Sequence, residues 1–232
     1  MSVSKTAILE LLRKEIRRYD KPAFRRNYQR FHKEKLEEPE GIKTDILRGI
    51  SDRTFRTIRS LPPSEILEIC EGLLASGVRY MPFFAFDWAE KSAGGLAQSD
   101  FARLERWLKR YVDNWGACDH LCCGALGKLV ARYPDLVPRT RKWVRSKSRW
   151  LRRAAAVSLI PGMRSSMDLR EGFATADLLL ADDDDMVRKG CGWMLKEATR
   201  RFPREVLAYV VRNREKMSRT TLRYAVEKLS AA

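Results

Sequence analysis

Several features that mark other protein classes are missing from this chain of 232 residues. No apolar run is long enough to span a bilayer, which argues against an integral membrane protein. The first residues, from Met1 to Lys5, lead into a charged amphipathic segment and lack the apolar stretch of a signal peptide. Strand signals are scarce, because no hairpin dipeptide lies between alternating apolar runs. We therefore expect a helical, cytosolic protein with no membrane partner.

Cysteine is also sparse, with five residues, and their odd number together with the missing export signal indicates reduced thiols. The segment from Cys118 to Cys123 invites a metal interpretation, since Cys118 and Cys122 could share one helix face. Structural zinc usually has four convergent ligands, however, and no matching second pair occurs elsewhere in the chain. Buried thiols are the favoured interpretation and a metal site is the alternative. We predict neither a metal nor a cofactor.

What the chain has in excess is positive charge. Lys and Arg number 46 against 30 Asp and Glu, which gives a formal net charge of +16. This excess favours a polyanionic partner such as DNA or RNA, although an anionic membrane surface or an acidic protein would satisfy the same charge. Hydrophobic residues make up 44% of the chain, so a packed core is expected.

Helical periodicity recurs along the chain. The apolar stripes comprise Ala7, Ile8, Leu11, Leu12 and Ile16; Ile66, Leu67, Ile69, Leu73 and Leu74; Leu104, Trp107, Leu108 and Val112; Leu121, Leu126, Leu129 and Val130; and Val206, Val210 and Val211. The segments 132–137 and 201–206 share one pattern. Each has a basic residue, an aromatic residue and a proline, followed by a charged residue and, at the sixth position, a valine. Each follows a segment that carries a tryptophan. This pattern predicts repeated helix pairs, as in HEAT-type solenoids.

We predict a single domain over residues 1–232, with N-terminal helices in 1–40 and helical repeats in 41–232. Basic residues crowd the N-terminal, middle and C-terminal parts of the chain. In a curved solenoid of antiparallel helix pairs such clusters can line one concave wall and follow phosphates. The acidic run Asp182 to Asp185 precedes a predicted helix, where carboxylates favour the positive end of the helix dipole. Helix capping is therefore expected there, and a calcium site is not.

Trp115 and Asp119 form the most informative pair in the sequence. If their segment is helical, they lie one turn apart on the same face. Two later helix-like segments contribute Arg153 and Trp193. A carboxylate among aromatic and arginine side chains on a basic protein is suited to holding a cationic sugar or base of a nucleic acid. A lone tryptophan in a helix is more often part of the core, and the prediction is a core or packing residue for Trp88, Trp107, Trp143 and Trp150.

These segments resemble the DNA alkylation repair family of AlkD-like glycosylases. That family has a Trp-x-x-x-Asp helix, a Trp-Leu-x-Arg-x-Ala helix and a Lys-x-x-Gly-Trp-x-Leu-[Arg/Lys]-Glu helix, and all three patterns occur here in that order. The N-terminal residues Tyr28 to Phe31 and Gly41 to Lys43 are also similar to the family pattern. Asn114 departs from it, because the prototype carries a second tryptophan there.

The resemblance implies a HEAT-like α-solenoid that acts as a monofunctional glycosylase in base excision repair. Its expected substrates are cationic N3- or N7-alkylated purines, such as 3-methyladenine and 7-methylguanine, in double-stranded DNA. Asp119 would stabilise the oxocarbenium charge and orient water, while Trp115 and Trp193 would hold the cationic nucleotide. Arg153 would grip a phosphate and keep Asp119 ionised. Further DNA contacts are expected from Tyr28, Lys43, Arg149, Arg152, Lys189 and Lys196.

Two other functions remain open at this point. One is a non-catalytic HEAT-repeat protein that binds branched or damaged DNA, and the other is a protein-interaction scaffold. Retention of the pair Trp115 and Asp119 favours the enzyme over the first, and the positive charge disfavours the second. A monomer is expected, since duplex DNA would occupy the concave face.

Overall fold

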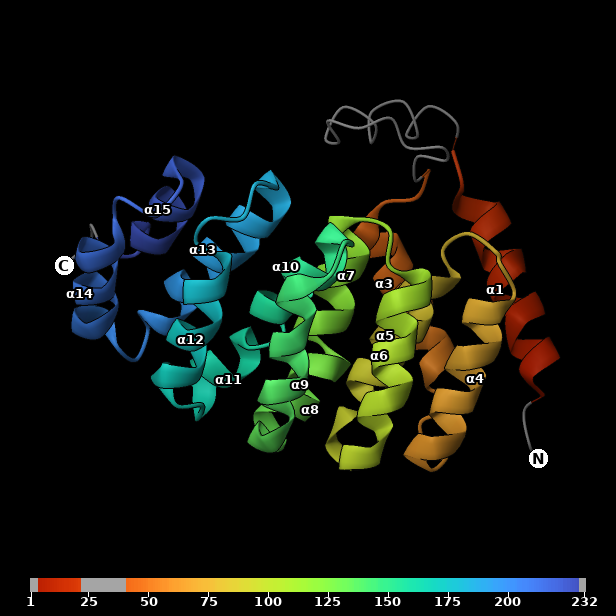
Figure 1. Cartoon of the computed structure of the whole chain (residues 1–232). Coiled ribbons are helices and arrows are strands. Elements are labelled where there is room, and N and C mark those ends of the chain that lie inside the picture. The colour runs from red at the N-terminus through yellow and green to blue at the C-terminus, as the bar shows by residue number, and fades with distance from the viewer. Residues whose placement is uncertain (1–3, 22–40, 230–232) are drawn as a thin grey trace. The chain divides into compact units, whose positions relative to one another are not determined.

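A computed structural model of the chain describes residues 4–21 and 41–229, and its regular elements in those ranges are helices without strands (Figure 1). The predicted all-α class is therefore confirmed for the described part of the chain. Contacts within the chain divide it into two compact units, residues 1–89 and 90–232. No helix in the described ranges is both long and apolar enough to cross a membrane.

The first unit is built from four described helices: α1 (Lys5–Tyr19), α3 (Thr44–Phe55), α4 (Pro63–Ala75) and α5 (Met81–Lys91). The first of them, α1, packs against α3 and α4 through Ile8, Leu12 and Ile16. The prediction that Ala7 and Leu11 share this buried stripe is wrong. Both are exposed, because the contact follows a narrow row of residues four apart.

The helices of the second unit are mostly shorter than those of the first and are joined by short turns. Its described helices are α6 (Phe101–Tyr111), α7 (Trp115–Cys123), α8 (Ala125–Arg132), α9 (Val137–Arg141), α10 (Arg149–Val157), α11 (Ile160–Ser165), α12 (Leu169–Leu179), α13 (Asp185–Ala198), α14 (Pro203–Asn213) and α15 (Arg219–Val226). Four 3-10 turns complete it: η1 (Ala93–Gly95), η2 (Gln98–Asp100), η3 (Pro134–Leu136) and η4 (Lys142–Arg145).

These helices form two layers. One layer runs from α7 to α10, α13 and α15, each helix packed on the next, and α8, α11 and α12 pack behind it. The predicted helix boundaries at the repeated proline segments are confirmed, since α8 ends at Arg132 and α14 begins at Pro203. The arrangement of paired helices matches the predicted α-solenoid class.

Close approach of α13 to α15 depends on one glycine. A Cβ atom on Gly192 would lie 2.6 Å from the Cβ of Tyr224 and 2.8 Å from the carbonyl oxygen of Thr221. Because no side chain fits that space, the two helices meet backbone to side chain without an intervening layer. This contact sets how closely the middle of α13 lies against the last helix.

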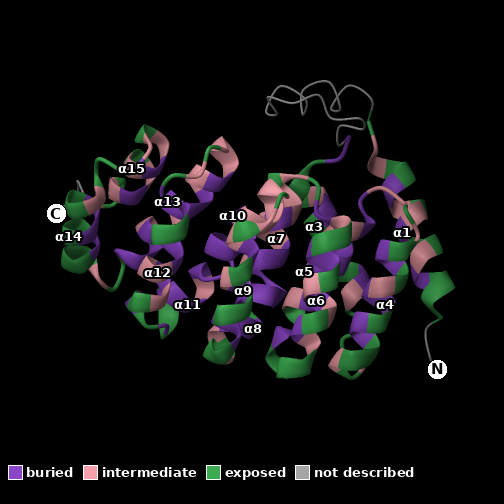
Figure 2. Ribbon diagram, in the orientation of Figure 1, coloured by how far each residue is buried: buried purple, intermediate pink, exposed green. Residues whose placement is uncertain are grey.

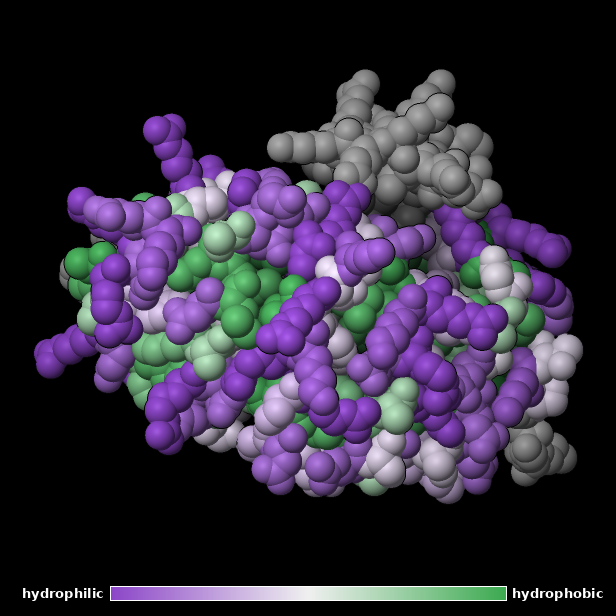
Figure 3. Space-filling model, viewed as in Figure 1, coloured by the Kyte–Doolittle hydropathy of each residue, from purple (hydrophilic) through white to green (hydrophobic). Residues whose placement is uncertain are grey.

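Buried residues lie on the helix faces that turn toward neighbouring helices (Figure 2). Hydrophilic residues make up most of the face drawn in Figure 3, with hydrophobic residues visible between them. Trp88, Trp107 and Trp143 are buried, as predicted. Trp150 is only partly buried at the start of α10, so of the two predicted roles, core or packing residue, it has the second. Val211 is likewise exposed on α14, beside the buried Val206 and Val210.

Candidate functional site

The helix that carries the Trp115 and Asp119 pair begins where a side chain can cap it. Asn114 is the N-cap of α7, and its side-chain oxygen accepts a hydrogen bond of 2.9 Å from the backbone N–H of Ala117. Trp115 is therefore the first helical residue, and its side chain is 40% exposed. Asp119 follows one turn later, as the spacing predicts. The cap thus places Trp115 in the first turn of α7.

Asp119 and Arg153 form a two-pronged ion pair between α7 and α10. Arg153 donates from Nε to Oδ1 of Asp119 over 2.8 Å and from Nη2 to Oδ2 over 2.7 Å. The remaining terminal nitrogen, Nη1, donates to the backbone carbonyl of Met186 at the start of α13. Arg153 thereby joins three adjacent helices. Each carboxylate oxygen has two lone pairs, so each oxygen of Asp119 keeps one beyond its bond to Arg153.

Burial differs between the two partners of this pair. The Arg153 side chain is 6% exposed, whereas that of Asp119 is 18% exposed. The expected grip of Arg153 on a phosphate does not fit this geometry, because its guanidinium is covered and already bonded on each nitrogen. Arg153 instead orients Asp119. An arginine two positions after Leu151 was readable from the sequence, but its burial was not.

The pKa of the Asp119 carboxyl is raised above its usual range. Burial is the largest cause, and the hydrogen bonds and charge of Arg153 oppose it without cancelling it. The expected effect of Arg153 is thus correct in sign but smaller than the cost of burial. The pKa of Arg153 is also raised: burial lowers it, but its bonds to Asp119 outweigh burial. A carboxylate with a raised pKa accepts a proton more readily than an exposed aspartate.

A glycine on α13 makes room for Arg153. A Cβ atom on Gly190 would lie 3.1 Å from Cγ of Arg153 and 3.4 Å from its Nη1. The arginine side chain therefore passes directly over the helix at this position on its way to Asp119. The glycine is part of the sequence pattern, but only the structure shows that the Arg153 side chain lies against it.

Trp193 lies on α13, one turn after Lys189, and is partly buried. Its indole nitrogen donates to Oε1 of Glu197 over 3.3 Å. The structure thus brings Asp119, Arg153 and Trp193 onto three neighbouring helices, of which α10 packs against both α7 and α13. Glu197 was not among the predicted site residues, although its spacing of four from Trp193 places both on one helix face.

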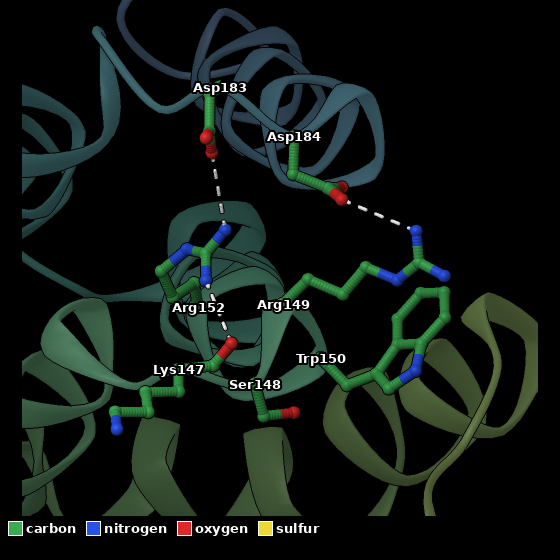
Figure 4. Close-up of a pocket in the computed structure, with 7 residues that line it drawn as sticks. All are labelled: Lys147, Ser148, Arg149, Trp150, Arg152, Asp183 and Asp184. Atoms are coloured by element: carbon green, nitrogen blue, oxygen red, sulfur yellow. Dashed lines mark hydrogen bonds and ion pairs between the residues drawn. The ribbon is translucent and has the colours of Figure 1, made fainter.

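The predicted phosphate contacts at the start of α10 are paired with the acidic run. Arg152 binds Asp182 over 2.7 Å, and Arg149 lies 3.3 Å from Asp184. Arg149, Arg152 and Asp184 line a pocket of about 530 Å³ together with Lys147, Ser148, Trp150 and Asp183 (Figure 4). Figure 4 also shows the Arg149 guanidinium over the ring of Trp150, with 4.8 Å to the ring centroid.

The acidic run also caps α13, as predicted. Asp184 is the N-cap, and Oδ1 accepts from the backbone N–H groups of Met186 and Val187. The middle basic cluster contains few acids in the sequence, but the fold brings these carboxylates to it from some thirty residues away. A single sequence contains no pattern from which ion pairs between residues so far apart can be predicted.

The other predicted DNA contacts are spread over the chain. Lys189 pairs with Asp185 over 2.8 Å, and Lys196 lies between Glu227, at 3.1 Å, and the Tyr224 ring. Lys43 is exposed and immediately precedes α3, in the first unit. Tyr28 lies outside the described residues.

The five thiols of the chain are free and mostly buried, as the favoured interpretation predicted. Cys118 donates to the carbonyl of Trp150 and Cys123 to that of Val157, each from α7 to α10. Burial raises the pKa of the Cys122 and Cys123 thiols, and it raises that of Cys191 to about 12. These protonated thiols pack α7 against its neighbour.

Comparison with known proteins assigns the chain to a family. The model of the DNA alkylation repair enzyme family matches residues 12–229. The chain belongs to this family. Membership gives it a role in DNA repair and makes DNA its partner, as predicted.

The solved structures contain a similar fold. A predicted DNA alkylation repair enzyme from Enterococcus faecalis superposes with a TM-score of 0.76 at 14% sequence identity, covering 92% of this chain and 98% of that one. At this identity the similarity shows the fold alone. A search of curated proteins gives no match.

Proposed function

We propose that the protein is a monofunctional DNA glycosylase that excises cationic N3- and N7-alkylated purines, such as 3-methyladenine and 7-methylguanine, from duplex DNA. The observation that carries the proposal is the Asp119 carboxylate. Arg153 holds it by both oxygens, yet part of its surface stays open, one helical turn from the exposed Trp115. A held, accessible carboxylate beside an aromatic ring suits a cationic sugar.

The chemistry needs a carboxylate and no strong acid. A purine alkylated at a ring nitrogen is positively charged, so it leaves as a neutral base when the C1′–N bond breaks and its electron pair goes to the base. Positive charge then develops on the deoxyribose, and Asp119 stabilises it. Water adds to C1′ and gives up a proton, which the carboxylate can accept because its pKa is raised. The products are an abasic site and the free base.

The tryptophans supply the walls of the site. Trp115 and Trp193 contact the cationic nucleotide through their ring faces, at about 0.5–2 kcal/mol for each cation–π contact. Because both lie on helices that pack against α10, they flank the helix that carries Arg153. Arg153 is a positioning residue that keeps Asp119 ionised and oriented.

Phosphates replace aspartates at the basic positions when DNA binds. Arg149 and Lys189 pair with aspartates at the surface, and exposed ion pairs contribute only about 0–1 kcal/mol. A duplex exchanges these carboxylates for phosphates at little cost, and Lys196 leaves Glu227 for a phosphate in the same way. Arg152 contributes least, because the Asp182 side chain is only 8% exposed and holds Arg152 by two hydrogen bonds. Tyr28 and Lys43 extend the contact. Residues 1–232 act as one monomeric domain in the cytosol.

Release of bases from methylated duplex DNA tests the proposal. The wild-type protein frees 3-methyladenine or 7-methylguanine, and Asp119→Asn lowers the single-turnover rate by at least about 100-fold, the loss typical of an electrostatic stabiliser. Asp113→Asn is the matched control, since Asp113 is exposed just before the same helix and its removal changes the net charge equally. Equal rates for Asp119→Asn and wild type would exclude the catalytic role.

The same geometry favours a second candidate function, a non-catalytic protein for branched or damaged DNA. Both oxygens of Asp119 already accept from Arg153, so the pair neutralises itself and could serve only to join α7 to α10. Such a protein binds DNA with a steep salt dependence but releases no base. Binding without excision in the assay above selects this candidate.

A further inference from the structure

Glu197 is a buried carboxylate on which several elements of the second unit converge. Its side chain is 4% exposed, and four side chains among the described residues donate to it. Trp193 and Lys228 reach Oε1, at 3.3 and 3.0 Å. Arg164 and Arg200 reach Oε2, each at 2.8 Å. The donors come from α11, from α13, from the turn after α13 and from the segment after α15.

This surrounding keeps Glu197 charged. Burial acts to raise its pKa, but hydrogen bonds and charges from Arg164 and Lys228 outweigh burial and lower the pKa to about 2. At any pH at which the protein works, the carboxylate is an acceptor that cannot become a donor. Its position is defined from four directions, because its bonds run to separate segments of the chain.

The indole of Trp193 is the neutral member of this group. An indole N–H can only donate, and a buried one needs an acceptor. Glu197 lies one turn further along the same helix, so the bond holds the ring plane of Trp193 relative to the axis of α13. We propose that Glu197 is a positioning residue for Trp193, setting the orientation in which this ring meets the nucleotide. The inference rests on the proposed function, because it assumes that Trp193 contacts the substrate.

The molecule contains a matched arrangement outside the site. Trp143 donates from its indole nitrogen to Oε1 of Glu105 over 2.8 Å, and Lys109 and Arg139 lie at the same carboxylate. The pKa of Glu105 is also lowered: burial raises it, and the bonds from Trp143 and Lys109 outweigh burial. Trp143 is buried in the core, stacked on Phe101. Glu105→Gln therefore disturbs the same kind of bond with no effect on a substrate-facing ring.

A double-mutant cycle on excision tests the positioning role. We expect Glu197→Gln to slow single-turnover excision about tenfold at saturating DNA, the size of one lost hydrogen bond to a charged group. Trp193→Phe slows it as well, and the double variant is no slower than Trp193→Phe alone, since phenylalanine has no N–H for Glu197 to hold. Glu105→Gln leaves the rate unchanged. Additive losses in the double variant would overturn the proposal.

The indole N–H resonance of Trp193 gives a readout that needs no excision activity. Trp193→Phe identifies this resonance by removing it. In Glu197→Gln we expect the resonance to shift and its proton to exchange faster with water, while Glu105→Gln alters only the resonance of Trp143. An unchanged Trp193 resonance in Glu197→Gln overturns the positioning role even if the protein excises bases. A shifted resonance without any excision supports the positioning role and counts against the glycosylase.

Wild-type protein alone provides a measurement should Glu197→Gln fail to fold. In the native state the indole proton of Trp193 must exchange with water more slowly than that of free tryptophan, because Glu197 holds it. Exchange as fast as in free tryptophan contradicts the proposal.

Discussion

Two carboxylates of the second unit, Asp119 and Glu197, show opposite responses to burial. Among the described residues Asp119 has one cationic partner, Arg153, and its pKa is raised because burial outweighs that partner. The Glu197 side chain is 4% exposed, and the hydrogen bonds and charges of Arg164 and Lys228 outweigh its burial, so its pKa falls to about 2. The cations around Glu197 outweigh the cost of its burial, whereas the single cation beside Asp119 does not.

This difference in pKa and exposure suits Asp119 to act on a substrate and Glu197 to orient neighbouring side chains. Asp119 keeps open surface and a raised proton affinity, which are the properties of a group that works on a substrate. Glu197 has neither, since its proton affinity is low and its oxygens are covered. In one stack of helices the same chemical group thus serves in two ways, and the difference predicts how each will respond to substitution.

The largest effect is expected from removing the single partner of Asp119. Arg153→Met leaves a buried carboxylate without its cation, and breaking a buried pair in this way costs about 3–5 kcal/mol of unfolding free energy. Urea unfolding followed by circular dichroism measures the loss. The double variant Asp119→Leu with Arg153→Met should recover most of it, because no unpaired charge remains.

A surface arginine provides the control for that prediction. Arg170 pairs with Asp168 but is almost fully exposed. Arg170→Met should leave the unfolding midpoint unchanged, because water solvates the partner that remains. A loss at Arg153 no larger than at Arg170 would show that the pair is not buried in solution.

A smaller effect is expected from the pH dependence of stability. The folded pKa of Glu197, about 2, lies below its usual value of 4.5, so its contribution is complete above pH 4.5 and is lost as the pH falls toward 2. Glu197→Gln should be less stable than wild type at neutral pH, by a difference on the order of 2 kcal/mol. The gap should close as the pH approaches 2, and unfolding curves across this window measure it. A gap that stays constant with pH would show that the charge of Glu197 contributes nothing.

The smallest effect is expected at the glycine over which Arg153 passes. Gly190→Ala places a Cβ 3.1 Å from Cγ of Arg153. The arginine cannot move aside, because its Nε and Nη2 are hydrogen-bonded to the two oxygens of Asp119. We expect a loss of about 1 kcal/mol, at the low end of overpacking costs. Gly72→Ala on α4 is the control, since its Cβ would meet only the flexible Lys5 side chain at 3.8 Å. It should gain up to about 1 kcal/mol of helix propensity. Equal gains at both positions would mean that Arg153 is free to shift.

Local patterns in the sequence predict the helices and the face of α7 well. The spacing of four between Trp115 and Asp119 depends only on helix geometry, and Asn114 before them is a good N-cap. The apolar stripe of α4, from Ile66 to Leu74, is buried as predicted. These features need no knowledge of distant residues.

Interactions between distant segments cannot be derived from local sequence patterns, although the family resemblance implied that Arg153 acts on Asp119. The bonds from Arg153 to Asp119 and to the carbonyl of Met186 depend on helix packing, and so does the pairing of Arg152 with Asp182. The sequence therefore predicted Arg153 and Arg152 as exposed phosphate ligands, because it cannot report which cations the fold neutralises. Glu197 was overlooked for the same reason, since three of its donors come from other elements or turns.

The dependence of the excision rate on pH tests most directly whether Asp119 is the reacting carboxylate. On methylated duplex DNA at saturating protein, the wild-type single-turnover rate should fall as the pH is lowered through the raised pKa of Asp119, because protonation removes the charge that stabilises the sugar cation. Asp119→Asn should be at least about 100-fold slower and should lack this acid limb. An Asp119→Asn variant with the wild-type rate and the same acid limb would contradict the account.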